Sequence, residues 1–183
     1  MLFGERPIDP RVLAEGLALG VTSKVEQGED WTRAVKDVLL KLGKDRGRYV
    51  APDKSVSQRE YMLDLLWFGD SDTNDIVLAV ESEWGGTTNV WEDFDKLMHI
   101  KAPLKVMILS TSQRGEQSQA LVKGIQELYM QKFSQHVKGE EYLLIEFVHP
   151  NKIVYCHHYE VPKDGKLEIV RFELLSAIQY PVT

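Results

Sequence analysis

The stretch that decides the fold spans residues 61–83 and reads YMLDLLWFGDSDTNDIVLAVESE. Two largely apolar segments are separated by GDSDTN at 69–74, a run of residues that favour turns. We therefore expect strands at residues 60–68 and 76–83 that fold back on each other as an antiparallel hairpin. This hairpin would form the start of a larger sheet.

Three carboxylates, Asp64, Glu81 and Glu83, lie in or at the ends of these apolar strands. Side chains alternate between the two faces of a strand, so Glu81 and Glu83 point the same way, and the hairpin would bring Asp64 beside them. Burying an unpartnered carboxylate is costly, which favours a function for these residues. Three converging carboxylates suit Mg²⁺ or Mn²⁺. The alternative is that the acids face solvent at a strand end.

Asp64, the triplet Glu81-Ser82-Glu83, a helix and a third strand together resemble the core of the PD-(D/E)xK, or restriction-endonuclease-like, nuclease superfamily over residues 30–111. The family motif is an Asp on one strand and an acidic-x-Lys triplet on the next. This chain has Glu83 at the lysine position, as in ExE variants. Some members take the lysine from the following helix, which makes Lys96 the replacement. The resemblance implies an α/β fold with a mixed central β-sheet flanked by helices, an αβββαβ core and extra C-terminal strands.

The function that the resemblance implies is metal-dependent phosphodiester hydrolysis of nucleic acid, with DNA favoured over RNA, by a Mg²⁺-dependent (or Mn²⁺-dependent) endonuclease-like hydrolase. Asp64 and Glu81 would hold the metal, and Glu83 would orient or deprotonate the attacking water. Lys96 would stabilise negative charge in the transition state. A surface ion pair with Glu92, four residues earlier, is the alternative role for Lys96.

A different class of function also fits: a catalytically silent nuclease-fold protein that acts as a binding or regulatory module. The replaced strand lysine and the net charge of −6 favour it. Nucleases of this class often carry a further acidic ligand on the helix before the Asp strand, and Glu26 and Glu29 lie near the start of that helix. Many work as dimers, so a homodimer or a protein partner is compatible with the resemblance.

The whole chain of 183 residues fits a single restriction-endonuclease-like domain, residues 1–183. It contains no apolar run of the roughly 20 residues that a membrane span needs, and it begins without a secretory pattern. A lone cysteine, Cys156, excludes an internal disulfide and agrees with a cytoplasmic location. The acidic charge argues against broad affinity for nucleic acid. A local basic rim remains available at Lys36, Lys41, Lys44, Arg46 and Arg48.

Apolar periodicity and turn residues predict the other elements. Helices are expected at residues 10–20, 28–42, 88–100 and 117–137, and strands at 104–111, 141–149, 152–162 and 166–174. Residues 48–51 allow one further strand. Cys156 and His158 share a strand face, but no second pair at zinc spacing exists in the sequence, so we interpret them as part of an ordinary hairpin strand.

Overall fold

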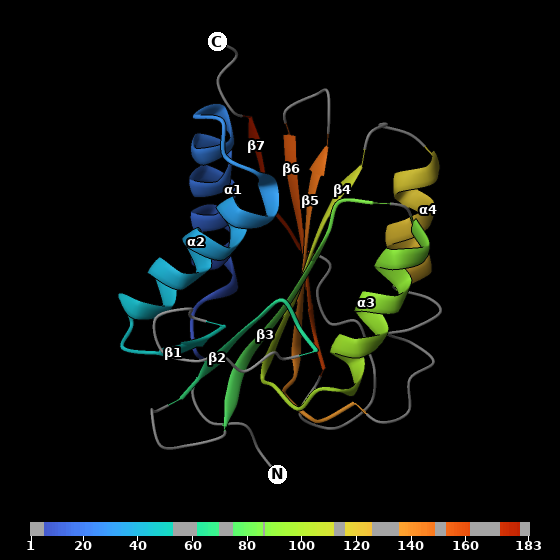
Figure 1. The fold of residues 1–183 in the computed structure, drawn as a ribbon. Coiled ribbons are helices and arrows are strands. Elements are labelled where there is room, and N and C mark those ends of the chain that lie inside the picture. The colour runs from blue at the N-terminus through green and yellow to red at the C-terminus, as the bar shows by residue number, and fades with distance from the viewer. Residues whose placement is uncertain are drawn as a thin grey trace.

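A mixed β-sheet with helices on both sides forms the centre of the computed structural model (Figure 1). The structure describes residues 6–52, 62–69, 75–85, 87–111, 116–125, 136–148, 153–161 and 173–179. Within them the sheet has seven strands in sequential order, with β3, β4 and β5 parallel and the other neighbours antiparallel. The strands are β1 (Tyr49–Ala51), β2 (Leu65–Phe68), β3 (Ile76–Glu83), β4 (Leu104–Thr111), β5 (Glu141–Val148), β6 (Ile153–Glu160) and β7 (Glu173–Gln179).

Helices α1 (Pro10–Glu26) and α2 (Trp31–Lys44) lie on one side of the sheet, and α3 (Thr87–His99) and α4 (Glu116–Gly124) lie on the other (Figure 1). The side chains of Asp9 and Asp30 cap α1 and α2 by accepting hydrogen bonds from backbone N–H groups of the first turn. None of the described helices is long and apolar enough to cross a membrane.

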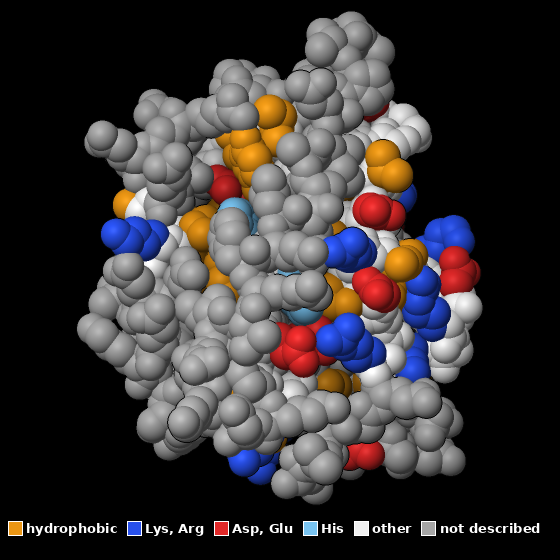
Figure 2. Space-filling view, turned by 180° about the vertical axis from the view of Figure 1, so that it is seen from behind, with side chains coloured by type: hydrophobic (Ala, Val, Ile, Leu, Met, Phe, Trp, Pro, Cys, Tyr) orange, Lys and Arg blue, Asp and Glu red, His pale blue; other side chains and the backbone are white. Residues whose placement is uncertain are grey.

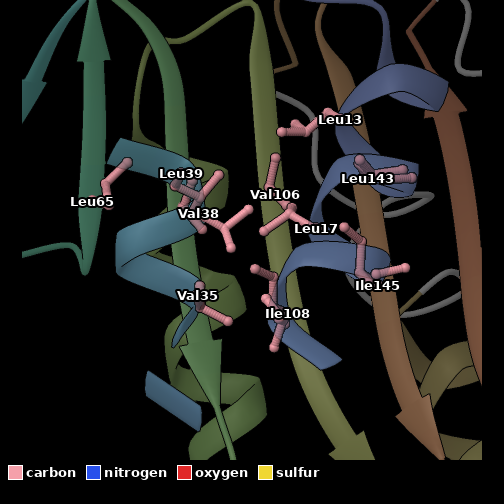
Figure 3. Close-up of a cluster of buried hydrophobic side chains, with 14 of the residues drawn as sticks. Leu13, Leu17, Val35, Val38, Leu39, Leu65, Val106, Ile108, Leu143 and Ile145 are labelled. Carbon is pink, nitrogen blue, oxygen red and sulfur yellow. The ribbon is translucent and has the colours of Figure 1, made fainter. Parts of the chain in front are cut away.

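The core on the α1 and α2 side is built mainly from aliphatic side chains, with Trp67 and Phe147 also buried in it (Figure 3). Residues from both helices meet residues from strands β2, β4 and β5, namely Leu13, Leu17, Val35, Val38, Leu39, Leu65, Val106, Ile108, Leu143 and Ile145. Helix α1 continues to Glu26, beyond the predicted end at residue 20. Gly20 lies within this helix. A Cβ there would come within 2.8 Å of the Val38 side chain, so glycine permits the close approach of α2.

The strands supply a second core on the α3 side because successive residues alternate between faces. In β3, Leu78 and Val80 belong to the first core and Ala79 to the second, where it packs with Phe94 of α3. The same alternation carries Glu81 toward the α3 side of the sheet. Strand β3 therefore brings the carboxylate of Glu81, two residues before its end, to the space beside α3.

The predicted mixed sheet flanked by helices is confirmed, and so is the antiparallel hairpin of β2 and β3. The first hairpin strand was predicted to begin at residue 60, but β2 begins at Leu65, and residues 62–64 form bends. The prediction of a strand at 60–68 was therefore wrong for these three residues. Residues 53–61 lie outside the described residues, as do 126–135 of the helix predicted at 117–137 and 166–172 of the last predicted strand.

Candidate carboxylate and lysine site

A pocket of about 440 Å³ lies where β3 ends, between residues of α2 on one side and of α3 on the other. Its polar wall combines carboxylates from the hairpin with lysines from both helices. The lining residues are Lys36, Pro52, Met62, Leu63, Asp64, Glu81, Ser82, Glu83, Asp93 and Lys96. All four sequence-predicted site residues, Asp64, Glu81, Glu83 and Lys96, are among them.

Asp64 is held firmly although it precedes β2. Its Oδ2 accepts hydrogen bonds from the backbone N–H of Ser82 at 2.9 Å and from the Ser82 hydroxyl at 2.8 Å. Its backbone N–H donates to Glu81 Oε2 at 3.3 Å. The hairpin register, in which Leu65 faces Val80, explains this arrangement because it places Asp64 opposite Glu81. The predicted proximity of Asp64 and Glu81 is therefore confirmed.

Glu81 is a buried carboxylate, only 4% exposed, with incomplete hydrogen bonding. Its Oε1 has no hydrogen-bond partner among the described residues, and Lys96 Nζ lies 3.5 Å away. Burial raises the pKa of Glu81 to about 7, and the negative charges of Asp64 and Asp93 add to the effect. The charge of Lys96 and the hydrogen bond from Asp64 oppose it. Glu81 is thus a site where an additional cation would be stabilised.

Lys96 reaches this pocket from α3. Its Nζ lies 2.6 Å from Asp93 Oδ1, and the side chain is 40% exposed. Hydrogen bonding to Asp93 is the main cause that raises the pKa of Lys96, and the charge of Glu81 contributes. The alternative prediction, an ion pair of Lys96 with Glu92, was wrong. Lys96 pairs with Asp93, three positions earlier, and Glu92 is exposed. The long aliphatic stem lets the ammonium bend toward the sheet.

Glu83 lines the same pocket but its carboxylate turns back to its own chain. Oε1 accepts a hydrogen bond from the backbone N–H of Gly85. A Cβ at Gly85 would come within 2.6 Å of that oxygen, so glycine leaves room for this local turn. Glu83 is therefore placed at the rim of the pocket, whereas Asp64 and Glu81 form its central pair.

The predicted cluster of three carboxylates around one metal does not form. The described residues contain no group of three or more His, Cys, Asp or Glu side chains able to hold a metal ion. The physical reason is that Glu83 is bound by Gly85 while Lys36 and Lys96 lie against the other two acids. What remains is the pair of Asp64 and Glu81 with a lysine beside each, and Asp93 of α3 against Lys96.

The further acidic ligands considered from the sequence do not join the pocket. Glu29 forms an ion pair with Lys24 at 3.1 Å, and neither Glu26 nor Glu29 lines the pocket. Helix α2 contributes Lys36 instead, with Nζ 3.1 Å from Asp64 Oδ1. Three neighbouring acids, Glu60, Asp70 and Asp72, lie outside the described residues.

The basic rim expected at the end of α2 is mostly used elsewhere. Lys41 pairs with Asp45, and Arg48 donates to the carbonyl of Gly69, so of this group only Lys36 lines the pocket. On the face drawn in Figure 2, Lys and Arg side chains lie close to Asp and Glu side chains rather than forming a patch of one sign.

Sequence reasoning missed Asp93 and the role of Lys36. The spacing of three residues between Asp93 and Lys96 on one helix was the available signal for Asp93. For Lys36 the signal was weaker. Lys36 directly follows Val35, and Val35 is one of the buried residues of α2. The contact itself depends on how α2 crosses the sheet.

The histidines of β6 are engaged in protein contacts. His158 Nε2 lies 2.7 Å from Glu141 Oε2, and Cys156 is fully buried in the core beside α1 and α2.

Comparison of the chain with protein-family models, with curated proteins and with solved structures found no match.

Proposed function

We propose that this protein is a nuclease of the PD-(D/E)xK type, a divalent-cation-dependent hydrolase of phosphodiesters in nucleic acid, with DNA as the favoured substrate. The observation that carries the proposal is the pair of Asp64 and Glu81 at the end of the hairpin, with Lys96 3.5 Å from Glu81 in an open pocket. A buried carboxylate with an unsatisfied oxygen and a raised pKa, lying in a pocket, is typical of functional sites.

The order of elements supports the same proposal. Helix α2, strands β1, β2 and β3, helix α3 and strand β4 follow one another in the order that an αβββαβ core would have, and β5 to β7 would be its extra C-terminal strands. Asp64 immediately precedes β2, Glu81 lies near the end of β3, and Lys96 lies on α3. These are the positions at which the resemblance expects the acids and the replacement lysine.

The donor set of the pocket fits a Mg²⁺ or Mn²⁺ ion bound by two carboxylates. Glu81 Oε1 is buried and lacks a hydrogen bond from the described residues, so a cation would remove an electrostatic penalty. Mg²⁺ in phosphoryl-transfer sites is commonly held by one or two carboxylates, with water and substrate phosphate completing the shell. A third protein carboxylate is therefore not required.

We assign each residue a role that its contacts support. Asp64, fixed by Ser82, and Glu81 would hold the ion, which when bound polarises the phosphoryl oxygen and acidifies water. Lys96 would offset the negative charge that develops on the phosphate. Glu83 would have to leave its hydrogen bond with the backbone N–H of Gly85 before it could accept a proton from the attacking water.

The direct test is hydrolysis of DNA and RNA substrates by the purified chain with Mg²⁺ or Mn²⁺. We expect cleavage that EDTA abolishes and that Asp64→Asn and Glu81→Gln each reduce about 100-fold or more. Asp45→Asn is the matched control because Asp45 is an exposed carboxylate that pairs with Lys41 outside the pocket. Equal cleavage by Asp64→Asn and the parent chain would refute the proposed site.

A catalytically silent binding module is the second candidate function. It is favoured by the fact that both lysines at the pocket already contact carboxylates and by Glu83 standing where the motif has lysine. In that case the parent chain would bind nucleic acid or a protein partner without cleaving any substrate at any cation concentration. The hydrolysis assay, repeated as a binding assay on the same substrates, separates the two functions.

A further inference from the structure

The two oxygens of Asp64 have different partners. Oδ2 accepts both hydrogen bonds from Ser82, which fixes the orientation of the carboxylate. Oδ1 instead faces the ammonium of Lys36 at 3.1 Å, and Lys36 belongs to a different element, helix α2. Both residues line the pocket. One oxygen of Asp64 therefore stabilises the fold. The other is paired with the Lys36 ammonium, a cation that another cation can replace.

Lys36 is not held in place by acids of its own helix. The positions three and four residues away on either side are Thr32, Arg33, Leu39 and Leu40. Its chain neighbour Asp37 is contacted by Lys24 at 3.3 Å. The ion pair with Asp64 is partly exposed, with 38% of the Lys36 side chain and 25% of the Asp64 side chain accessible. Ion pairs of this exposure are weak and easily exchanged.

We propose that Lys36 stands in for the divalent cation on Asp64 in the metal-free protein and, once the cation has bound, contacts an oxygen of the substrate phosphate. This inference rests on the proposed function. A divalent ion at Asp64 would repel the Lys36 ammonium from its present position. Lysine has a flexible four-carbon stem and binds phosphate as a point charge, so a phosphodiester in the pocket is the chemical group that it would meet.

The proposal predicts effects of opposite sign on two ligands. Removing the charge of Lys36 frees Asp64 from a competing cation, so Mn²⁺ should bind more tightly. The same change removes a phosphate contact, so nucleic acid should bind less tightly. An ion pair with a purely structural role would weaken both bindings together or change neither.

The variants are chosen to isolate the charge. Lys36→Met keeps the aliphatic stem, and Lys36→Arg keeps the positive charge. Lys41→Met is the matched control because Lys41 lies on the same helix and pairs with Asp45 outside the pocket. Circular dichroism and thermal unfolding of each variant establish that the fold is retained.

Mn²⁺ binding is measured by calorimetry with the metal alone, and phosphate binding by fluorescence anisotropy of a labelled DNA duplex in Ca²⁺. For Lys36→Met we expect Mn²⁺ affinity to rise about two- to fivefold and duplex affinity to fall roughly tenfold. Lys36→Arg should restore duplex binding, and Lys41→Met should match the parent in both assays.

Unchanged or weaker Mn²⁺ binding by Lys36→Met, or unchanged duplex binding, would overturn the inference. If the parent binds Mn²⁺ through Asp64 and Glu81 while Lys36→Met behaves like the parent, only the role of Lys36 fails and the proposed function stands. A parent that binds neither Mn²⁺ nor the duplex overturns both.

Discussion

Glu81 and Glu140 are almost equally buried, at 4% and 2% exposure, yet their surroundings differ. Glu140 Oε1 accepts a hydrogen bond from Lys105 at 2.9 Å, and Oε2 accepts from Tyr142 at 3.0 Å. Glu81 Oε1 has no hydrogen-bond partner among the described residues. Burial itself raises the pKa of both carboxyls. Hydrogen bonding with His136 and the charge of Lys105 outweigh burial at Glu140 and lower its pKa, whereas the pKa of Glu81 remains raised to about 7.

The difference teaches that the set of partners, rather than burial, separates a structural carboxylate from a candidate functional one. Lys105 also contacts the carbonyl of Met98 near the end of α3, at 3.4 Å, so the network around Glu140 joins that helix to the sheet. It is a satisfied and closed network. Glu81 instead opens into a pocket and carries a cost that a ligand can remove.

The largest expected effect comes from breaking the satisfied network. Lys105→Met leaves Glu140 buried without its cation, and we expect the free energy of unfolding to fall by about 3–5 kcal/mol. Urea unfolding at neutral pH measures the change. Lys41→Met, which removes an exposed cation, should change it by no more than about 0.5 kcal/mol. A loss below about 1 kcal/mol for Lys105→Met would mean that the network is not a stabilising anchor.

Replacing Glu81 or Glu140 by glutamine should change the free energy of unfolding with opposite signs. Glu81→Gln removes a disfavoured charge, so we expect a gain of about 1–3 kcal/mol near pH 8. Glu140→Gln removes a favoured charge and should destabilise the protein. Urea unfolding of both variants under the same conditions makes the comparison. Destabilisation by Glu81→Gln near pH 8 would contradict the electrostatic description of the pocket.

The stability of the parent chain should depend on pH through Glu81. Its folded-state pKa of about 7 lies above the ordinary value of 4.5, so between these values the folded state binds more protons than the unfolded state. Stability contributed by this group is therefore full below about pH 4.5 and is lost as the pH rises to about 7. The difference between the parent and Glu81→Gln should accordingly grow from about pH 5 to about pH 8. A difference independent of pH would show that the pKa of Glu81 is not raised.

The smallest effects should distinguish Glu92 from Asp93, the acids four and three positions before Lys96 on α3. Asp93→Asn removes the contact with Lys96 at 2.6 Å and should cost about 0.5–1 kcal/mol. Glu92→Gln changes an exposed residue and should stay within about 0.5 kcal/mol of the parent. Thermal unfolding measures both, and equal effects would mean that the contact of Asp93 with Lys96 adds no stability beyond that of an exposed acid.

The sequence predicted the order of helices and strands because apolar periodicity and turn residues are local signals. It also predicted that Asp64 and Glu81 meet, since strand alternation and a hairpin leave few other registers. The Lys105 network escaped prediction because Lys105 lies in an apolar strand and Glu140 is 35 residues away. Lys36 and Asp93 were missed as site residues because their contacts depend on how the helices cross the sheet. The hydrogen bond between Glu83 and the backbone N–H of Gly85 was not predicted because it depends on the backbone conformation after β3, which the neighbouring residue types do not determine.

The central claim is that Asp64 and Glu81 together bind a divalent cation, and Mn²⁺ calorimetry tests it most directly. We expect the parent chain to bind Mn²⁺, Asp64→Asn and Glu81→Gln each to lose about tenfold or more in affinity, and Asp45→Asn to bind as the parent does. Parent-like binding of Mn²⁺ by Asp64→Asn and Glu81→Gln, or no binding by a folded parent, would contradict the claim.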